Sequence, residues 1–312
     1  MRTQRGAIEE GNATSISPLF RQLGCQAADW RRASGHGEVA VVVGLREEFE
    51  MLDAVKAGFV AIGFEPSPAS IRAMSSRISA MPEPVRNRVQ FVTPTYNSST
   101  STWRWPQLRR PGGCWCASCD QSACDHSFSG FAYIVNAAVD NQHHTVHIPD
   151  KVAGGNNIAS SKGAPVPAVT LDSFLPAWVR SVHMLQIDVE GWELHVLQGA
   201  VALLRHGKIR RVLFEFSPWR MERYKTGRPI ELLEFLPGLG AMCYDATGNY
   251  NRLPRPSTPL PAYLSSLYDG KNCDSKYVYY RKHCPGGAVP PNDIYGPIED
   301  IICGFSATSA VQ

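Results

Sequence analysis

Acidic residues and a glycine stand where predicted strands end, and such positions bind ligands in many α/β proteins. Gly44 closes the apolar run EVAVVVG, and Glu65 closes a second apolar run 21 residues later. In nucleotide-binding folds the glycine lets the backbone approach the ligand, and an acidic residue about 20 positions further on accepts hydrogen bonds from the ribose hydroxyls. A carboxylate offers acceptors to both hydroxyls at once. The alternative is an α/β domain in which this glutamate has no ligand.

Two further acidic positions follow the next predicted strands. The run 187–191 (IDVEG) joins a buried strand to a helix, so Asp188 is expected in the ligand crevice at the carboxyl end of the strand. Glu190 is expected at the helix N-terminus, where a negative charge is favoured; both acids could instead only cap that helix. Glu215 lies inside the apolar strand VLFEF, where a charge is costly unless it is paired or functional. Its alternative role is a structural hydrogen bond to a neighbouring loop.

The elements that must position these residues alternate along the chain. Continuous apolar runs predict buried strands at 38–44, 60–66, 132–138, 182–188 and 210–216. Apolar residues at helical spacing predict helices at 47–57, 68–80, 190–205 and 229–236. Strands and helices in this order form right-handed βαβ units. We therefore expect parallel strands in one sheet, with Glu65, Asp188 and Glu215 at the same edge.

The remaining segments set the domain boundaries. Residues 1–37 are predicted to be a polar extension with a short helical segment at 19–30, 38–305 the main domain, and 306–312 a tail. Within the main domain, 93–130 has no sustained periodicity and is interpreted as an irregular surface insertion. Residues 143–148 are expected to form a hairpin with 132–138, and 154–167 to form a Gly/Ser/Pro loop. Two late strands are predicted at 276–280 and 301–305.

The insertion contains four closely spaced cysteines and a histidine that are possible metal ligands, and the cysteines are also possible disulfide partners. They are Cys114, Cys116, Cys119, Cys124 and His126. Four thiolate or imidazole ligands suit a tetrahedral zinc site, although this spacing matches no standard zinc module. Local disulfides or free thiols account for the same residues, and the principal interpretation assigns no metal. Three histidines, His143, His144 and His147, are interpreted as exposed hairpin residues.

Composition excludes some classes of protein. The 312 residues carry a net charge of +3 without a basic block, so nucleic acid is not an expected partner. No apolar stretch is long enough to span a bilayer, and the polar N-terminus does not resemble a secretory signal. Nine cysteines and two glycosylation sequons, at Asn12 and Asn97, leave both a cytoplasmic and a secretory location open.

A long run resembles one known family. The residues VTLDSFL (169–175), then MLQIDVEGWELHVLQGAVALLRHGKIRRVLFEF, resemble the FkbM-type methyltransferases, which show a TLD tripeptide, a K-I-D-V-E-G-x-E-x-x-V-L-x-G-A run and a strand ending in Glu. Gln186 stands where lysine is commoner. FEPSP (64–68) and NAAVDN (136–141) are similar to two other motifs of that family. Together these segments span about residues 38–216.

The resemblance implies a Rossmann-like α/β methyltransferase fold with a mostly parallel, doubly wound sheet and helices on both faces, to which this chain adds the Cys-rich insertion. It also implies S-adenosylmethionine as cofactor and methyl transfer to a hydroxyl oxygen of a small molecule or glycan. On matching positions, the residues expected to bind the cofactor are Gly44, Glu65, Asn136, Ala137 and Asp188. Asp188, Glu215 and Glu190 are the expected catalytic residues, with Asp188 the first choice for the base that takes the hydroxyl proton.

One departure from the family pattern bears on activity. The family has D-V-G-A-x-x-G after the first strand, whereas this chain reads Val42-Val43-Gly44-Leu45-Arg46-Glu47-Glu48. Glu48 could serve the ammonium group of the cofactor. The altered turn also favours an alternative, a catalytically impaired methyltransferase-like binding module. A nicotinamide-dependent oxidoreductase would require G-x-G-x-x-G here, which the chain lacks.

Overall fold

The computed structural model describes residues 39–45, 49–56, 59–97, 99–100, 102–108, 130–149, 163–245 and 299–305. The chain divides into two compact units. The first unit comprises Met1–Val139, His143–Val169 and Phe174–Leu185, and the second comprises Asp140–Gln142, Thr170–Ser173 and Gln186–Gln312. The predicted extension 1–37, the strand 276–280 and the tail 306–312 lie outside the described residues.

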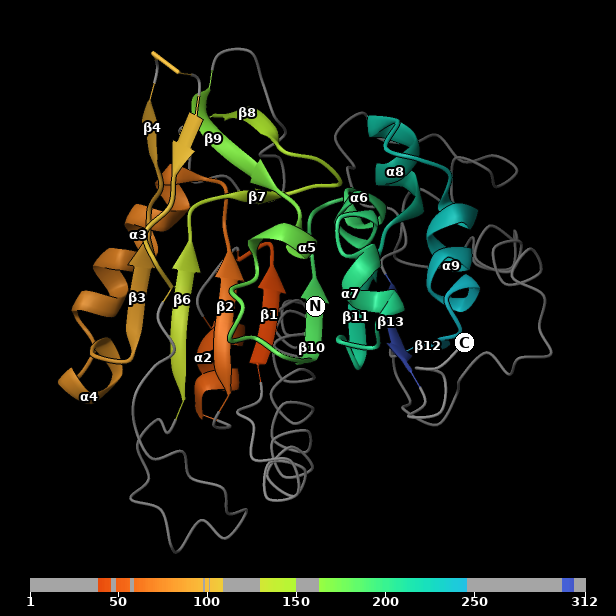
Figure 1. Cartoon of the computed structure of the whole chain (residues 1–312), viewed down its shortest axis with the longest axis horizontal. Coiled ribbons are helices and arrows are strands. Elements are labelled where there is room, and N and C mark those ends of the chain that lie inside the picture. The colour runs from red at the N-terminus through yellow and green to blue at the C-terminus, as the bar shows by residue number, and fades with distance from the viewer. Residues whose placement is uncertain are drawn as a thin grey trace, which may run out of the picture. The chain divides into compact units, whose positions relative to one another are not determined.

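The first unit is built on a sheet with the strand order β10-β1-β2-β6-β3. Its strands are β1 (Val39–Val43), β2 (Val60–Phe64), β3 (Val89–Val92), β6 (Phe131–Val135) and β10 (Val182–Ile187, which crosses into the second unit). The pairs β1–β2, β2–β6 and β6–β3 are parallel, so their arrows point the same way in Figure 1. Every residue of β1 and β2 is buried, because a parallel sheet is covered on both faces. Parallel pairing of the first three predicted strands is confirmed.

Helices of the first unit connect these strands. They are α2 (Phe49–Lys56), α3 (Pro68–Ser79) and α4 (Glu83–Arg86). Helix α2 packs against β1, β2 and β6. Helix α3 begins sharply, since Ser67 Oγ accepts from Ser70 N at 3.2 Å and Pro68 occupies its first turn. This cap fixes the short β2–α3 turn, which contains Glu65.

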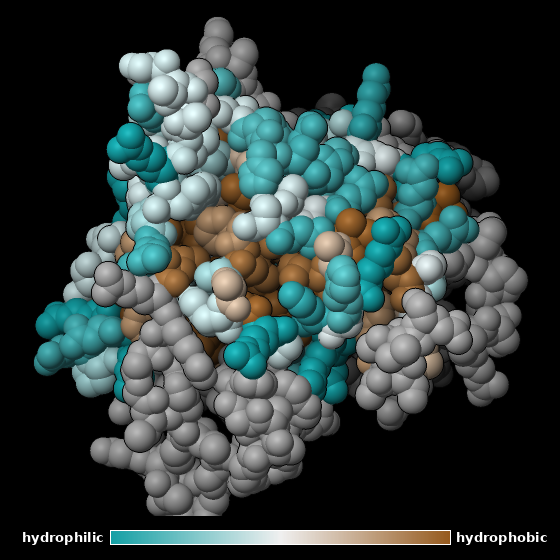
Figure 2. Space-filling model, in the orientation of Figure 1, coloured by the Kyte–Doolittle hydropathy of each residue, from teal (hydrophilic) through white to brown (hydrophobic). Residues whose placement is uncertain are grey.

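The predicted irregular insertion contains regular structure at its start. Strands β4 (Thr95–Asn97) and β5 (Thr102–Arg104) form an antiparallel hairpin beyond the carboxyl ends of β3 and β6 (Figure 1). The surface of this hairpin is pale to teal in Figure 2, that is, weakly to strongly hydrophilic. Aromatic contact between Tyr96 and Trp103, with ring centroids 4.8 Å apart, stabilises it across the strands. The prediction of an irregular segment was wrong here, because two strands of three residues each are too short to show a period of alternating apolar and polar residues.

Two other predictions about the first unit were also wrong. Strand β8 (His144–Ile148) pairs antiparallel with β9 (Ala164–Val169) and not with 132–138, and β9 occupies part of the predicted 154–167 loop. Strand β7 (Ala138–Val139) pairs only with the last two residues of β9. On the edge of β9 that faces away from β8, no described strand therefore lies opposite Pro165 and Pro167, and a proline whose N side faces this edge costs no ladder hydrogen bond. The short helix α5 (Leu171–Phe174) follows.

The described residues of the second unit include three antiparallel strands, most of the short helix α5, and four further helices. The strands, in the order β12-β13-β11, are β11 (Arg211–Phe216), β12 (Met242–Asp245) and β13 (Glu299–Gly304). The helices are α6 (Glu193–Gln198), α7 (Val201–Arg205), α8 (Pro218–Tyr224) and α9 (Pro229–Gly238). In the main sheet, the pairs β1–β2, β2–β6 and β6–β3 of the first unit are thus parallel, whereas the pairs β11–β13 and β12–β13 of the second unit are antiparallel. A mostly parallel, doubly wound sheet with helices on both faces stays a prediction.

The helix predicted at 190–205 is observed as two helices, α6 and α7. The first of them begins at Glu193, three residues after the predicted start. The break falls at Gly199, where a Cβ atom would lie 2.1 Å from the carbonyl oxygen of Asp140. Close packing of the chain against this carbonyl therefore requires glycine. Sequence periodicity continues across the break because both helices bury the same apolar face, which includes Leu197 and Leu204.

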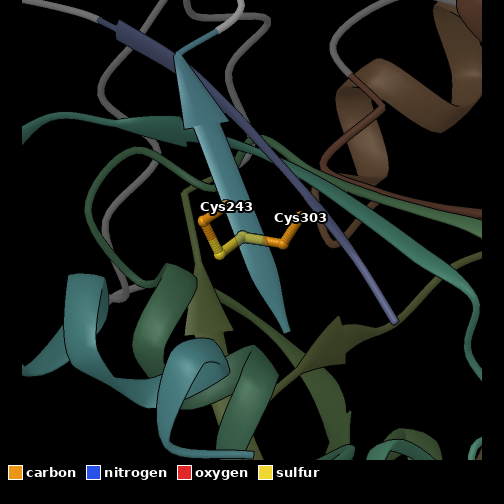
Figure 3. The surroundings of a disulfide bond; sticks show 2 residues. All are labelled: Cys243 and Cys303. Atoms are coloured by element: carbon orange, nitrogen blue, oxygen red, sulfur yellow. A yellow bond between two sulfur atoms is a disulfide. The ribbon is translucent and has the colours of Figure 1, made fainter. Parts of the chain in front are cut away.

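A disulfide joins the edge strand β12 to its neighbour β13 in the second unit. Cys243 on β12 and Cys303 on β13 are direct cross-strand partners, with Cα atoms 4.0 Å apart (Figure 3). The bond connects residues 60 positions apart in sequence. The predicted strand 301–305 is confirmed, but its covalent link to 242–245 was not foreseen.

None of the helices in the described residues is both long enough and apolar enough to cross a bilayer.

Candidate functional site

Gly44 forms the tight turn that its position after β1 predicted. Its φ is +93°, a left-handed conformation that glycine adopts without strain. The N–H groups of Gly44 and Leu45 both donate to the carbonyl oxygen of Phe64, at 3.0 and 3.1 Å. These bonds join the turn after β1 to the end of β2. Glu48, the proposed partner for an ammonium group, lies outside the described residues.

Glu65 lies at the carboxyl end of β2 and is only 6% exposed. Its backbone N–H donates to the carbonyl oxygen of Val135 at 3.0 Å, and its Oε1 accepts from Ser67 N at 2.7 Å. Burial raises the pKa of this carboxyl from 4.5 to about 8, although the Ser67 N–H acts in the opposite direction. Among the described residues, no hydrogen bond to its other oxygen, Oε2, is observed.

Asn136 and Ala137 follow β6, as predicted, and Asn136 contacts the Glu65 turn directly. Its side-chain Nδ2 donates to the carbonyl oxygens of Glu65 at 3.0 Å and of Pro66 at 3.2 Å. Ala137 is fully buried beside it. The side-chain amide of Asn136 thus holds the backbone at Glu65 and Pro66 through two hydrogen bonds. Sequence alone did not assign this structural role. Gly44, Glu65, Asn136 and Ala137 form one cluster of the first unit.

The 188–191 turn belongs to the second unit and differs from its prediction. Glu190 is not part of a helix, because α6 begins only at Glu193. Its φ is +59°, uncommon for a residue with a side chain, and Gly191 follows at +100°. The expected stabilisation of Glu190 by a helix N-terminus is therefore wrong. Its carboxylate instead forms an ion pair with Arg220.

Glu215 lies near the end of β11, as predicted, with its side chain 16% exposed. Its Oε2 accepts from Arg220 Nη1 at 2.6 Å. Burial raises the pKa of Glu215 well above 4.5, the charge of Asp188 raises it further, and Arg220 lowers it. The structure therefore brings Glu190 and Glu215 together through Arg220. Asp188 is half-buried and close enough to affect the pKa values of its neighbours.

Glu193 was missed as a site residue, although it is fully buried. Its Oε1 accepts from Gly191 N at 3.0 Å and from Val189 N at 3.2 Å, so it closes the 188–191 turn. Burial raises its pKa from 4.5 to about 7, since the two backbone donors offset only part of the desolvation. The signal in the sequence was its place in the E-G-W-E run, where it was interpreted only as part of a helix face.

Two other acids of the second unit have structural partners. Asp172, in the TLD tripeptide, accepts from Ala202 N and Leu203 N, both at 2.9 Å, and so caps the N-terminus of α7. Asp140 Oδ1 lies 3.0 Å from His195 Nδ1. Sequence spacing could not show either partnership, because each joins residues at least 30 positions apart.

The Cys-rich segment, with Cys114 to Cys124 and His126, lies outside the described residues. Within the ranges that the structure describes, no group of three or more His, Cys, Asp or Glu residues is arranged to hold a metal ion. His143, His144 and His147 are exposed, as predicted.

Comparison with known proteins identifies one family. The model of the methyltransferase FkbM domain matches residues 43–241, which is more than half of the chain and includes every predicted cofactor-binding and catalytic residue. No curated protein matches the chain.

Proposed function

The chain belongs to the FkbM methyltransferase family, and from this premise we propose that it transfers a methyl group from S-adenosylmethionine to a hydroxyl oxygen of a small molecule or glycan. The observation that carries the proposal is the Glu65 carboxyl group, which is held at one oxygen and available at the other. The second unit contributes a cluster of acids to which a base can be assigned.

The first-unit cluster fits the cofactor. Ser67 N fixes Glu65 Oε1, so the orientation of the carboxyl is set before a ligand arrives. Oε2 can then accept from ribose hydroxyls, and the left-handed turn at Gly44 lets a ligand approach the backbone. Asn136 Nδ2 keeps residues 65 and 66 in place. When bound, S-adenosylmethionine supplies an electrophilic methyl group on a positively charged sulfur.

Within the second unit, Asp188 is our first choice for the base. Methyl transfer from a sulfonium is an in-line displacement, so the protein has to align the acceptor and remove its proton. Glu190 and Glu215 each have one carboxylate oxygen engaged by Arg220, which restricts how these side chains can turn toward an acceptor. Asp188 stands directly after β10 and is half-buried, so solvent and a substrate can reach it. Glu215 is the second choice.

Calorimetric titration with S-adenosylmethionine tests the proposal. We expect wild-type protein to bind, and Glu65→Ala to weaken binding by about 10- to 100-fold, because a hydrogen bond to a charged group contributes about 1.5–3 kcal/mol. Glu234→Ala is the matched control, since Glu234 is an exposed glutamate on α9. Equal affinities of wild type and Glu65→Ala would remove Glu65 from the site.

The same titration separates enzyme from binding module. Protein that binds the cofactor is then incubated with labelled cofactor and panels of sugars, small-molecule alcohols and carboxylic acids. Transfer of label to an alcohol supports the proposal and names the acceptor class. Absence of cofactor binding would favour the impaired binding module, and transfer only to carboxylic acids would correct the acceptor.

A further inference from the structure

Arg220 is a buried cation that the sequence pattern did not single out. It is the third residue of α8, is 4% exposed, and interacts electrostatically with four carboxylates that we call the acidic cluster: Asp188, Glu190, Glu193 and Glu215. Its Nη1 forms ion pairs with Glu215, at 2.6 Å, and with Glu190. A buried guanidinium needs such partners, because desolvation of an unpaired charge is costly.

The 188–191 turn packs against α8 at backbone level as well. A Cβ atom on Gly191 would lie 2.9 Å from Arg220 Cβ and 3.1 Å from the Arg220 carbonyl carbon. Thr226 Oγ1 donates to the carbonyl oxygen of Gly191. The turn that carries Asp188 therefore has its shape fixed by the segment that carries Arg220.

Charge explains why a cation is needed at this point. Glu215 feels the repulsion of Asp188, Glu190 and Glu193 in addition to its burial, and all four effects raise its pKa, whereas Arg220 lowers it. The same four carboxylates raise the pKa of Arg220. Without Arg220, further carboxylates of the acidic cluster would be protonated at neutral pH or would repel one another out of position.

We propose that Arg220 is a positioning residue for the methyl transfer: it holds Glu190 and Glu215 in place as carboxylates and fixes the turn that presents Asp188. This inference rests on the proposed function, since Arg220 acts through Asp188 and does not itself take the proton. Its consequence for the folded protein can be measured without any acceptor.

Thermal unfolding at pH 5.5 and pH 8 tests the charge role. A buried glutamate with a raised pKa stabilises the fold least above that pKa, because it must then be ionised in the folded state. Arg220→Met raises the pKa of Glu215 further, so we expect Tm to fall by about 5 °C or more at pH 8 and by less than half of that at pH 5.5. Arg205→Met, at an exposed arginine of α7, should show no such pH dependence.

Two further variants keep the test decisive if Arg220→Met folds poorly. Arg220→Lys retains the charge and should recover part of the loss at pH 8. Arg220→Met with Glu215→Gln removes both charges and should recover stability at pH 8 relative to Arg220→Met alone. Equal losses at both pH values, without recovery in either variant, would overturn the charge role of Arg220.

Cofactor titration and kinetics then address positioning. We expect Arg220→Met to bind S-adenosylmethionine within about threefold of wild type while kcat for the acceptor found by screening falls at least tenfold, with partial rescue by Arg220→Lys. Unchanged kcat, or a loss confined to KM, would overturn the positioning role. If wild type fails to bind the cofactor, the proposed function fails and positioning fails with it, whereas the unfolding data still decide the charge role.

Discussion

At the scale of single residues, Glu65 combines near-complete burial with a proposed role in cofactor binding that requires an ionised carboxylate. Its pKa of about 8 means that much of the free protein carries a protonated Glu65 at neutral pH. Ribose hydroxyls bind best to the carboxylate, which accepts at both oxygens. Cofactor binding should therefore be linked to loss of this proton.

The linkage predicts how affinity depends on pH. Below pH 8 the ionised fraction of Glu65 falls about tenfold per pH unit, so Kd for S-adenosylmethionine should rise in proportion as pH is lowered from 8 to 6. Above pH 9 the effect should level off. Calorimetry across this range measures it. Glu65→Gln serves as the control, because the glutamine does not titrate and any pH dependence of Kd that remains comes from the cofactor itself. Identical pH profiles of Kd for wild type and Glu65→Gln would contradict the prediction.

Asp188→Asn separates catalysis from binding at the same scale. The substitution preserves shape and polarity but removes the proton acceptor, so we expect turnover to fall by about 10²–10⁴ and cofactor affinity to stay within a few-fold. Initial rates with labelled cofactor and calorimetry provide the two measurements. If turnover is normal and affinity falls, Asp188 is a cofactor ligand, and the base must be sought at Glu215.

At the scale of elements, the contact between α8 and the 188–191 turn depends on the absence of one side chain. Gly191 has φ +100° and lies too close to Arg220 for a Cβ atom. Gly238, at the end of α9, has open space around it and no left-handed backbone. The two glycines therefore form a matched pair for substitution.

Gly191→Ala should destabilise the protein, whereas Gly238→Ala should not. Strain at a left-handed position together with the steric overlap predicts a loss of about 2–4 kcal/mol in the free energy of unfolding. Gly238→Ala should be neutral or stabilise by up to about 1 kcal/mol, because alanine favours helix and restricts the unfolded chain. Urea denaturation of both variants provides the comparison, and equal stabilities would show that α8 adjusts without cost.

At the scale of the whole molecule, the Cys243–Cys303 disulfide closes a loop of 60 residues between the last two described strands. Such bonds persist in oxidising compartments, whereas the nine cysteines by themselves left both a cytoplasmic and a secretory location open. Cys303 is buried and pairs in register with Cys243, so the bond also fixes β12 at the edge of its sheet.

Removing this bond should lower stability by restoring freedom to the unfolded chain. For Cys243→Ser with Cys303→Ser we expect a loss of about 2–4 kcal/mol in the free energy of unfolding, measured by urea denaturation without reductant. Non-reducing peptide mapping of the wild type identifies the bond directly. Detection of both cysteines as free thiols in protein purified without reductant would contradict the pairing.

Sequence alone determined the local elements and the family. Short continuous apolar runs rich in β-branched residues are typical of buried strands, so β1, β2 and most of β6, β10 and β11 followed from pattern. The motifs that end these strands also identified Gly44, Glu65, Asp188 and Glu215, because chemistry in α/β folds concentrates at the carboxyl ends of strands. Glu65 and Asn136 were therefore expected near one ligand before their contact was known.

Tertiary structure decided which of these residues act through one another. Arg220 is one arginine among many in the sequence, and only the packing of α8 on the 188–191 turn makes it the partner of Glu190 and Glu215. Glu193 resembles a helix-face residue until its hydrogen bonds to Val189 and Gly191 are seen. Local periodicity cannot contain such information, because burial, pKa and ion pairing depend on groups that the fold brings together from different elements.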